Sequence, residues 1–216
     1  MSGFVHVIES PSATDLLEGL TEGRALCEAL KLIRFKHCYN LVTTRETLLF
    51  SLRAKLADAI LKFPDDPPVL HLSMHGNQDG IGLTNGEFVS WHDLREMLQP
   101  INNAMSGQLL ICLSACFGAF GIRMAQTEGA EHPFGLLVGH YGSAGWADAG
   151  VGYITFYHQM AKLEPIEACV TAMRIASGDD KFCLYEGNLL KSAYVELVAK
   201  TQNERLLALL RQYPAD

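Results

Sequence analysis

Short blocks of apolar residues alternate along the chain with longer stretches in which apolar residues recur at helical spacing. The apolar blocks predict strands, at residues 4–8, 35–42, 69–74, 109–115, 134–139 and 182–185. The longer stretches predict helices, at about residues 14–32, 44–63, 148–163 and 165–177, with shorter ones after 90 and after 116 and a last one from about 189. This alternation is typical of a mostly parallel sheet covered on both faces. We therefore predict an α/β fold, an α/β/α sandwich with about six strands in its central sheet.

Two of the predicted strands end in reactive side chains. The segment VLHLSMHG delivers His75 just before Gly76, and LLICLSACFG delivers Cys116. In a parallel sheet the ligand-binding loops leave from the carboxyl ends of the strands, and neighbouring strands lie about 4.8 Å apart. If these two strands are neighbours, the imidazole reaches the thiol, and such a pair is a nucleophile with its base. The pattern therefore predicts a cysteine hydrolase.

Small residues flank both reactive groups. Gly76 lets the backbone pass close to a substrate, and Ala115 and Gly118 leave the turn at Cys116 open. The N–H groups of Gly76 and Cys116 are therefore candidates for an oxyanion hole. Taken singly, a histidine at a strand end is commonly structural and a cysteine in an apolar run is commonly a core thiol. It is the pairing of the two that favours catalysis.

Competing chemistries find weaker support. The i, i+4 pairs His71/His75 and Cys112/Cys116 would suit zinc on a helix, but on strands four residues span about 13 Å, too far for bonds of about 2.0–2.3 Å to one ion. No HExxH, CxxC, GxGxxG or GxxxxGK[ST] motif occurs. The serine-hydrolase motif GxSxG is also missing, since residues 142–145 lack its spacing. We predict no metal and no cofactor.

Composition narrows the class of protein and its partners. The 216 residues have room for one large domain, which we place at residues 1–216. A net charge of −7 with scattered Lys and Arg leaves no basic stripe for nucleic acid. The start lacks the features of a signal peptide, and no apolar run approaches the roughly 20 residues that span a bilayer. We expect a cytoplasmic protein without a membrane partner, whose six cysteines are reduced.

The residues around the pair resemble a known family. A strand ending in His-Gly, followed about forty residues later by one ending in Ser-Ala-Cys-x-Gly, resembles the caspase-like cysteine peptidases, a clan that includes caspases, metacaspases, separase and the bacterial CHAT peptidases. Ser114 and Phe117 depart from the caspase signature Q-A-C-[RQG]-G and point away from caspases proper. The CHAT branch is the most similar, through Trp146, Asp148, Phe156-Tyr157 and Glu167-Ala168; the resemblance covers about residues 69–177.

This resemblance implies a caspase-like fold and a cysteine endopeptidase. His75 would be the general base and Cys116 the nucleophile that forms a thioester, and the clan requires no third catalytic residue. The resemblance also implies substrate-binding roles for Ser114, Trp146 and Asp148. Several members of the clan that the chain resembles select Lys or Arg with an acidic pocket, and some place the acid two positions before the nucleophile. This chain has Ser114 there, so Asp148 is the remaining candidate, its alternative role being the N-cap of the following helix.

Two alternatives to an endopeptidase stay open. One is a catalytically idle caspase-like module that acts as a regulatory or scaffolding partner; the other is a hydrolase of a small amide or thioester. Only residues 117–133 separate the nucleophile from the next predicted strand, which is a poor site for maturation by cleavage. For an enzyme we therefore expect an uncut active chain, activated by a protein partner or ligand that orders the loops around His75 and residues 142–145.

Overall fold

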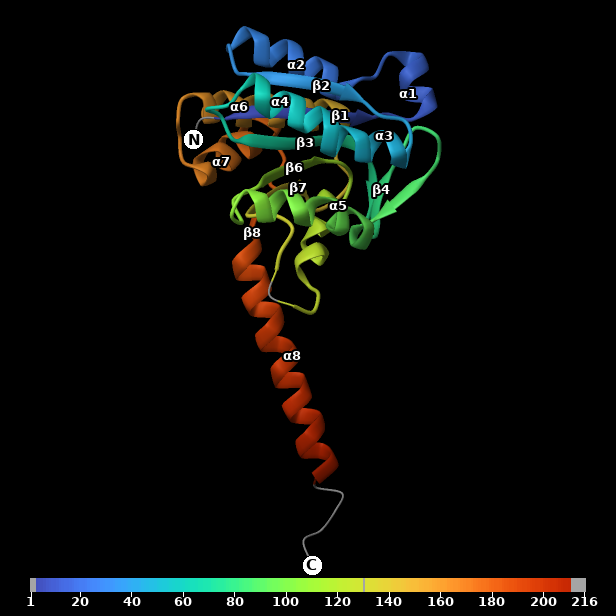
Figure 1. Ribbon diagram of the computed structural model, residues 1–216. Coiled ribbons are helices and arrows are strands. Elements are labelled where there is room, and N and C mark those ends of the chain that lie inside the picture. The colour runs from blue at the N-terminus through green and yellow to red at the C-terminus, as the bar shows by residue number, and fades with distance from the viewer. Residues whose placement is uncertain (1–2, 130, 211–216) are drawn as a thin grey trace, which may run out of the picture.

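A six-stranded sheet lies between two layers of helices in the computed structural model, which describes residues 3–129 and 131–210 (Figure 1). The strand order is β2-β1-β3-β6-β7-β8, and every neighbouring pair is parallel except β7 and β8. The predicted α/β fold with a mostly parallel central sheet is therefore confirmed. The strands are β1 (Phe4–Ser10), β2 (His37–Leu41), β3 (Pro68–Asn77), β6 (Leu110–Ser114), β7 (Leu136–His140) and β8 (Phe182–Glu186).

Each face of the sheet buries its own hydrophobic core. Strand side chains alternate between the two faces, so a strand covered on both sides is apolar at nearly every position, as β3 and β6 are. One core lies beneath α3 (Arg45–Phe50), the π-helical turn Ser51–Lys55, α4 (Leu56–Lys62) and α5 (Trp91–Ala104). The other lies beneath α2 (Glu22–Leu32), α6 (Trp146–Ala161) and α7 (Ile166–Ser177).

The predicted helix over residues 14–32 is in fact two helices. The first, α1 (Ala13–Glu18), begins at a capping box in which the Ser12 hydroxyl accepts the Asp15 N–H and the Asp15 carboxylate accepts the Ser12 N–H. It ends at Gly19, whose φ of 74° is the left-handed conformation that glycine adopts without strain. The break matters because it places the short helix α1 beside the carboxyl edge of the sheet.

The remaining elements follow the predicted order. A small hairpin joins β4 (Gly80–Gly82) and β5 (Phe88–Ser90), with Gly86 at a φ of 87° in the predicted turn. Ser90 is the N-cap of α5, as expected. The short helix expected after Cys116 is the 3₁₀ helix Gly118–Ala125. The last helix, α8 (Gly187–Leu210), projects away from the sheet (Figure 1). No helix within the described part of the chain is long and apolar enough to cross a membrane.

Candidate active site

His75 and Cys116 lie side by side at the carboxyl edge of the sheet. Strands β3 and β6 are parallel neighbours whose last paired residues are Ser73 and Ser114, and the two reactive residues lie two positions beyond. The backbones are in close contact there, because a Cβ on Gly76 would lie 2.6 Å from the Cys116 carbonyl oxygen. The prediction that the two strands are neighbours is confirmed.

Both side chains line one small pocket of about 60 Å³. Its remaining walls are Ser114, which ends β6, and Trp146, which begins α6, together with Met74, Ala115, Ala144 and Ala149. The Trp146 ring packs edge-on against the His75 ring, with centroids 5.5 Å apart. Ser114 and Trp146, both predicted to bind substrate, therefore border the space in front of the thiol.

A tight turn presents the cysteine. Phe117 adopts the left-handed conformation, with φ at 58°, and its N–H donates to the Gly142 carbonyl oxygen over 2.8 Å. The next residue must be glycine, because a Cβ on Gly118 would lie 2.5 Å from the Leu113 carbonyl oxygen. The turn lifts Cys116 out of the sheet, where its Sγ lies 3.7 Å from the Ala144 carbonyl oxygen as a hydrogen-bond donor.

The N–H groups at this turn differ in what they can offer a ligand. The Phe117 N–H already donates to the Gly142 carbonyl oxygen. The Cys116 N–H donates to no backbone acceptor in residues 3–129 and 131–210. Cys116 therefore keeps a free donor next to its own thiol, as the predicted oxyanion hole requires.

An acidic residue that sequence reasoning missed holds the imidazole of His75. The Nε2 of His75 lies 2.6 Å from Asp15 Oδ2 and donates to it, and the Ser12 hydroxyl donates to the same oxygen. Desolvation raises the pKa of Asp15, but hydrogen bonds from Ser12 and His75 bring it below the ordinary value of an aspartate. The S-x-x-D pattern at 12–15 marks a helix start, yet nothing local in it signals a partner 60 residues away.

The Gly-rich loop in front of Cys116 is fixed by a buried histidine. His140 at the end of β7 contacts the Gly142 carbonyl oxygen through Nδ1 over 2.8 Å and Asp179 through Nε2 over 2.9 Å. Its side chain is fully buried and does not line the pocket. His140 therefore holds in place the loop that carries Gly142 and Ala144. It does not itself border the pocket that contains the Cys116 thiol.

Asp148 lies outside the pocket. Gly145, not Asp148, is the N-cap of α6, so the predicted capping role is wrong. Asp148 lies in the first turn of α6, exposed to solvent, and is absent from the pocket walls. A glycine with ψ of 149° can serve as N-cap without a side-chain hydrogen bond, a choice that the residue types alone do not reveal.

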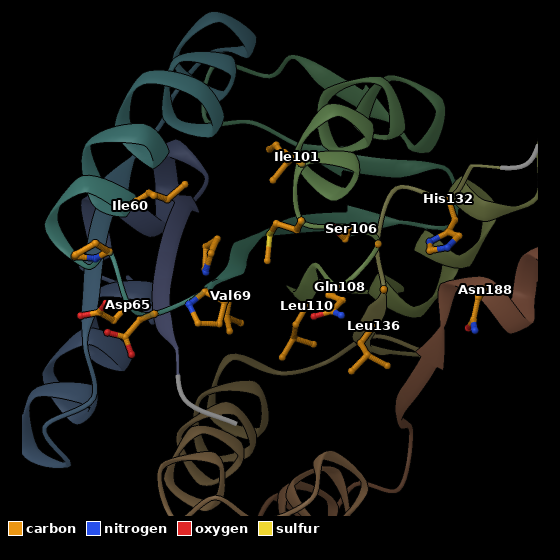
Figure 2. A pocket seen from close by; sticks show the side chains of 18 residues that line it. Ile60, Asp65, Val69, Ile101, Ser106, Gln108, Leu110, His132, Leu136 and Asn188 are labelled. Carbon is orange, nitrogen blue, oxygen red and sulfur yellow. The ribbon is translucent and has the colours of Figure 1, made fainter.

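A much larger pocket lies at the opposite edge of the sheet (Figure 2). Its volume is about 970 Å³, and it is bordered by the first residues of β3, β6 and β7, including Val69, Leu110 and Leu136. Its walls are mainly apolar and hold no cysteine, and His132 is engaged by the Phe134 carbonyl oxygen over 2.7 Å. Size alone therefore does not mark the reactive site.

The described residues contain neither a candidate metal site nor a disulfide bond. No group of three or more His, Cys, Asp or Glu side chains there could hold a metal ion. All six cysteines are unpaired; Cys27, Cys112 and Cys169 are buried, whereas Cys116 is partly exposed. Burial raises the pKa of the Cys112 thiol to about 12, which keeps it protonated. Cys38 is also partly exposed and lies 3.0 Å from His6 Nδ1, but burial raises the pKa of its thiol to about 11. Cys116 is the partly exposed cysteine that shares a pocket with a histidine.

Comparisons with known proteins add no family to this description. No protein-family model matches the chain. No curated protein matches it either. The function is therefore argued from the geometry at the carboxyl edge.

Proposed function

We propose that this protein is a cysteine endopeptidase of the caspase-like clan, with His75 and Cys116 as its catalytic residues. The observation that carries the proposal is their position on adjacent strand ends in one pocket, with His75 Nε2 already bound to Asp15. Because Nε2–H donates to the carboxylate, Nδ1 is the nitrogen left with a lone pair for the thiol. Asp15 thus sets the tautomer of the base.

The reaction follows from these groups. His75 Nδ1 takes the thiol proton, and the thiolate attacks the peptide carbonyl carbon. The free N–H of Cys116 stabilises the developing oxyanion. The N–H of Gly76 is the second donor that we propose for the oxyanion hole. The carbon–nitrogen bond breaks, and the departing amine carries away the proton held by His75. Water then attacks the thioester, which releases the acid product and restores the thiol.

Labelling tests this proposal directly. A peptide carrying an electrophilic carbonyl should modify Cys116 in the unmodified protein, as mapped by mass spectrometry of the digested chain. The same probe should fail on His75→Ala, although iodoacetamide at about pH 9, where an accessible thiol ionises without a base, should still alkylate Cys116 in that variant. Modification of another cysteine by the peptide probe would contradict the assignment.

A second candidate function has one specific observation in its favour. The thiol of Cys116 donates to Ala144 rather than to His75, which suits a catalytically idle module that acts as a regulatory or scaffolding partner. Catalytic hydrogen bonds often tighten only when substrate is bound, so the endopeptidase is the proposal we favour. We place it in the cytoplasm, with a peptide substrate and a partner that activates it by moving the loop at 142–145. An unmodified protein that resists the peptide probe even with its loops ordered by a partner would favour the idle module.

A further inference from the structure

The turn that presents Cys116 depends on a contact with the neighbouring strand. Phe117 has a φ of 58°, in the left-handed region, which is unfavourable for a residue with a side chain. Such a conformation persists only where the surrounding contacts fix it. Here the Phe117 N–H donates over 2.8 Å to the carbonyl oxygen of Gly142, just beyond the end of β7. The position of the Gly142 carbonyl group therefore contributes directly to the shape of the turn.

His140 holds Gly142 from the other side. Nδ1 of its buried ring lies 2.8 Å from the Gly142 carbonyl oxygen and 3.1 Å from the Gly142 nitrogen. A neutral ring accepts the Gly142 N–H at Nδ1, and a protonated ring donates from Nδ1 to the carbonyl oxygen. Both contacts hold the same residue. The His140 ring is itself confined by Phe182 of β8, which packs edge-on against it with centroids 4.9 Å apart.

Asp179 fixes the His140 ring from the loop between α7 and β8. Its Oδ2 lies 2.9 Å from His140 Nε2, and its Oδ1 accepts the Lys181 N–H over 2.9 Å. The hydrogen bond from Lys181, with a smaller effect of His140, lowers the pKa of Asp179 against desolvation, so the carboxylate is ionised at neutral pH. An ionised carboxylate can only accept, so His140 Nε2 carries the hydrogen between the two groups. The same two segments meet again where the Tyr141 N–H donates to the Lys181 carbonyl oxygen over 3.0 Å.

A continuous series of contacts thus runs from Asp179 to the turn at Cys116. Asp179 fixes the ring of His140, which in turn holds Gly142. The Gly142 carbonyl oxygen then accepts the Phe117 N–H. Neither Asp179 nor His140 borders the pocket of about 60 Å³. The two residues can therefore affect a reaction at Cys116 through the position of the turn, without touching a substrate.

We propose that Asp179, acting through His140, is a positioning residue for the proposed nucleophile Cys116. This inference rests on the proposed endopeptidase function and adds to it a residue outside the pocket. With Asp179 in place, the Gly142 carbonyl oxygen stays on the Phe117 N–H, and the turn keeps the thiol and the free N–H of Cys116 where they meet a substrate carbonyl. Without Asp179 the strained turn relaxes, and both groups are displaced.

Asp179→Asn, of equal size but neutral, tests the inference, with Asp180→Asn as its control. Asp180 is the next residue and is exposed, so its replacement should change neither measurement. In Asp179→Asn we expect kcat for peptide hydrolysis to fall at least about 10-fold, since small displacements of reacting groups are costly, while KM changes less than about twofold. The Phe117 N–H should also exchange with deuterated water at least about 10-fold faster, as measured by NMR on the free protein, because its bond to Gly142 opens more often.

A merely structural contact predicts a different result. It would lower the urea midpoint of Asp179→Asn while kcat stays that of Asp180→Asn. Unchanged kcat would overturn the positioning role and leave the endopeptidase intact. A fall in kcat with unchanged exchange at Phe117 would overturn it too, because the effect would then not pass through the turn.

Two further outcomes keep the test decisive. If Asp179→Asn fails to fold, as judged by circular dichroism, His140→Gln replaces it. The glutamine amide reaches the position of His140 Nε2 but not that of Nδ1, so this variant should show the same two effects, and their absence would overturn the positioning role. An unmodified protein that cleaves no peptide and resists the electrophilic probe would instead overturn the proposed function, and the positioning role with it.

Discussion

His75 Nε2 donates to Asp15 Oδ2 over 2.6 Å, although 60 residues separate the two in the chain. The carboxylate belongs to the first turn of α1 and is fixed by Ser12, so it is held in place before any substrate arrives. A base whose tautomer is already set needs no rearrangement to accept a proton at its other nitrogen. The pair therefore links the structure of a short helix to the chemistry that we propose at Cys116.

Asp15→Asn tests that link. We expect kcat/KM for peptide hydrolysis to fall at least about 10-fold, because the amide can hold the imidazole in the wrong tautomer. The pKa of Asp15 lies below its unfolded value, so its carboxylate contributes stability above that unfolded value, and this contribution is lost as the pH falls through the folded one. Urea unfolding of the variant should accordingly depend less on pH below about 4. The exposed Asp58→Asn should match the unmodified protein in both assays, and equal activity of Asp15→Asn would show that the contact is only structural.

Replacement of the proposed catalytic pair should separate activity from stability. Cys116→Ala and His75→Ala should each abolish peptide hydrolysis with little change in the free energy of unfolding, because both side chains border the pocket rather than the core. Cys112→Ala truncates a side chain that is completely buried. It should cost about 1–3 kcal/mol of stability yet keep a reactive thiol at position 116. Urea titration and an activity assay on the three variants check this, and a hydrolysing Cys116→Ala would refute the assignment.

The fold and half of the site follow from short-range patterns. Apolar blocks predict the strands because β3 and β6 are covered on both faces, and a reactive residue at a strand end predicts the pocket that holds His75 and Cys116. What the patterns miss depends on contacts across the chain. Asp15 resembles any acid at a helix start until the fold brings its carboxylate against His75, 60 residues further along the chain.

Gly76 tests how closely the two strand ends must pack. A Cβ at this position would lie 2.6 Å from the Cys116 carbonyl oxygen, a backbone atom that cannot move aside without shifting the proposed nucleophile. Gly76→Ala should therefore lower kcat by at least about 10-fold, since small displacements of reacting groups are costly. Gly82→Ala is a matched control, because Gly82 pairs with His75 across the β3–β4 ladder and its Cβ would meet the His75 Cβ at an ordinary 3.9 Å. Equal activity of the two variants would mean that the strand ends tolerate separation.

His6 on β1 predicts how stability depends on pH. The side chain is fully buried, with Nδ1 3.0 Å from Cys38 Sγ and Nε2 3.1 Å from the Ser51 carbonyl oxygen in the π-helical turn. Burial lowers its pKa from 6.5 to about 4, against the opposing effect of the Ser51 hydrogen bond. The unfolded chain therefore binds this proton first as the pH falls, so stability is lost from about pH 6.5 down to about 4.

Between pH 7 and pH 5 this single group should remove about 2 kcal/mol from the free energy of unfolding. His6→Gln eliminates the titration, so although the variant is less stable at pH 7 through its lost contacts with Cys38 and Ser51, its stability should fall less between the two pH values. The exposed His158→Gln keeps His6 and should show the full fall. Urea unfolding of the three proteins at both pH values measures the difference. An identical pH slope in His6→Gln would mean that His6 already binds its proton in the folded state, contrary to a buried neutral ring whose nitrogens contact Cys38 and Ser51.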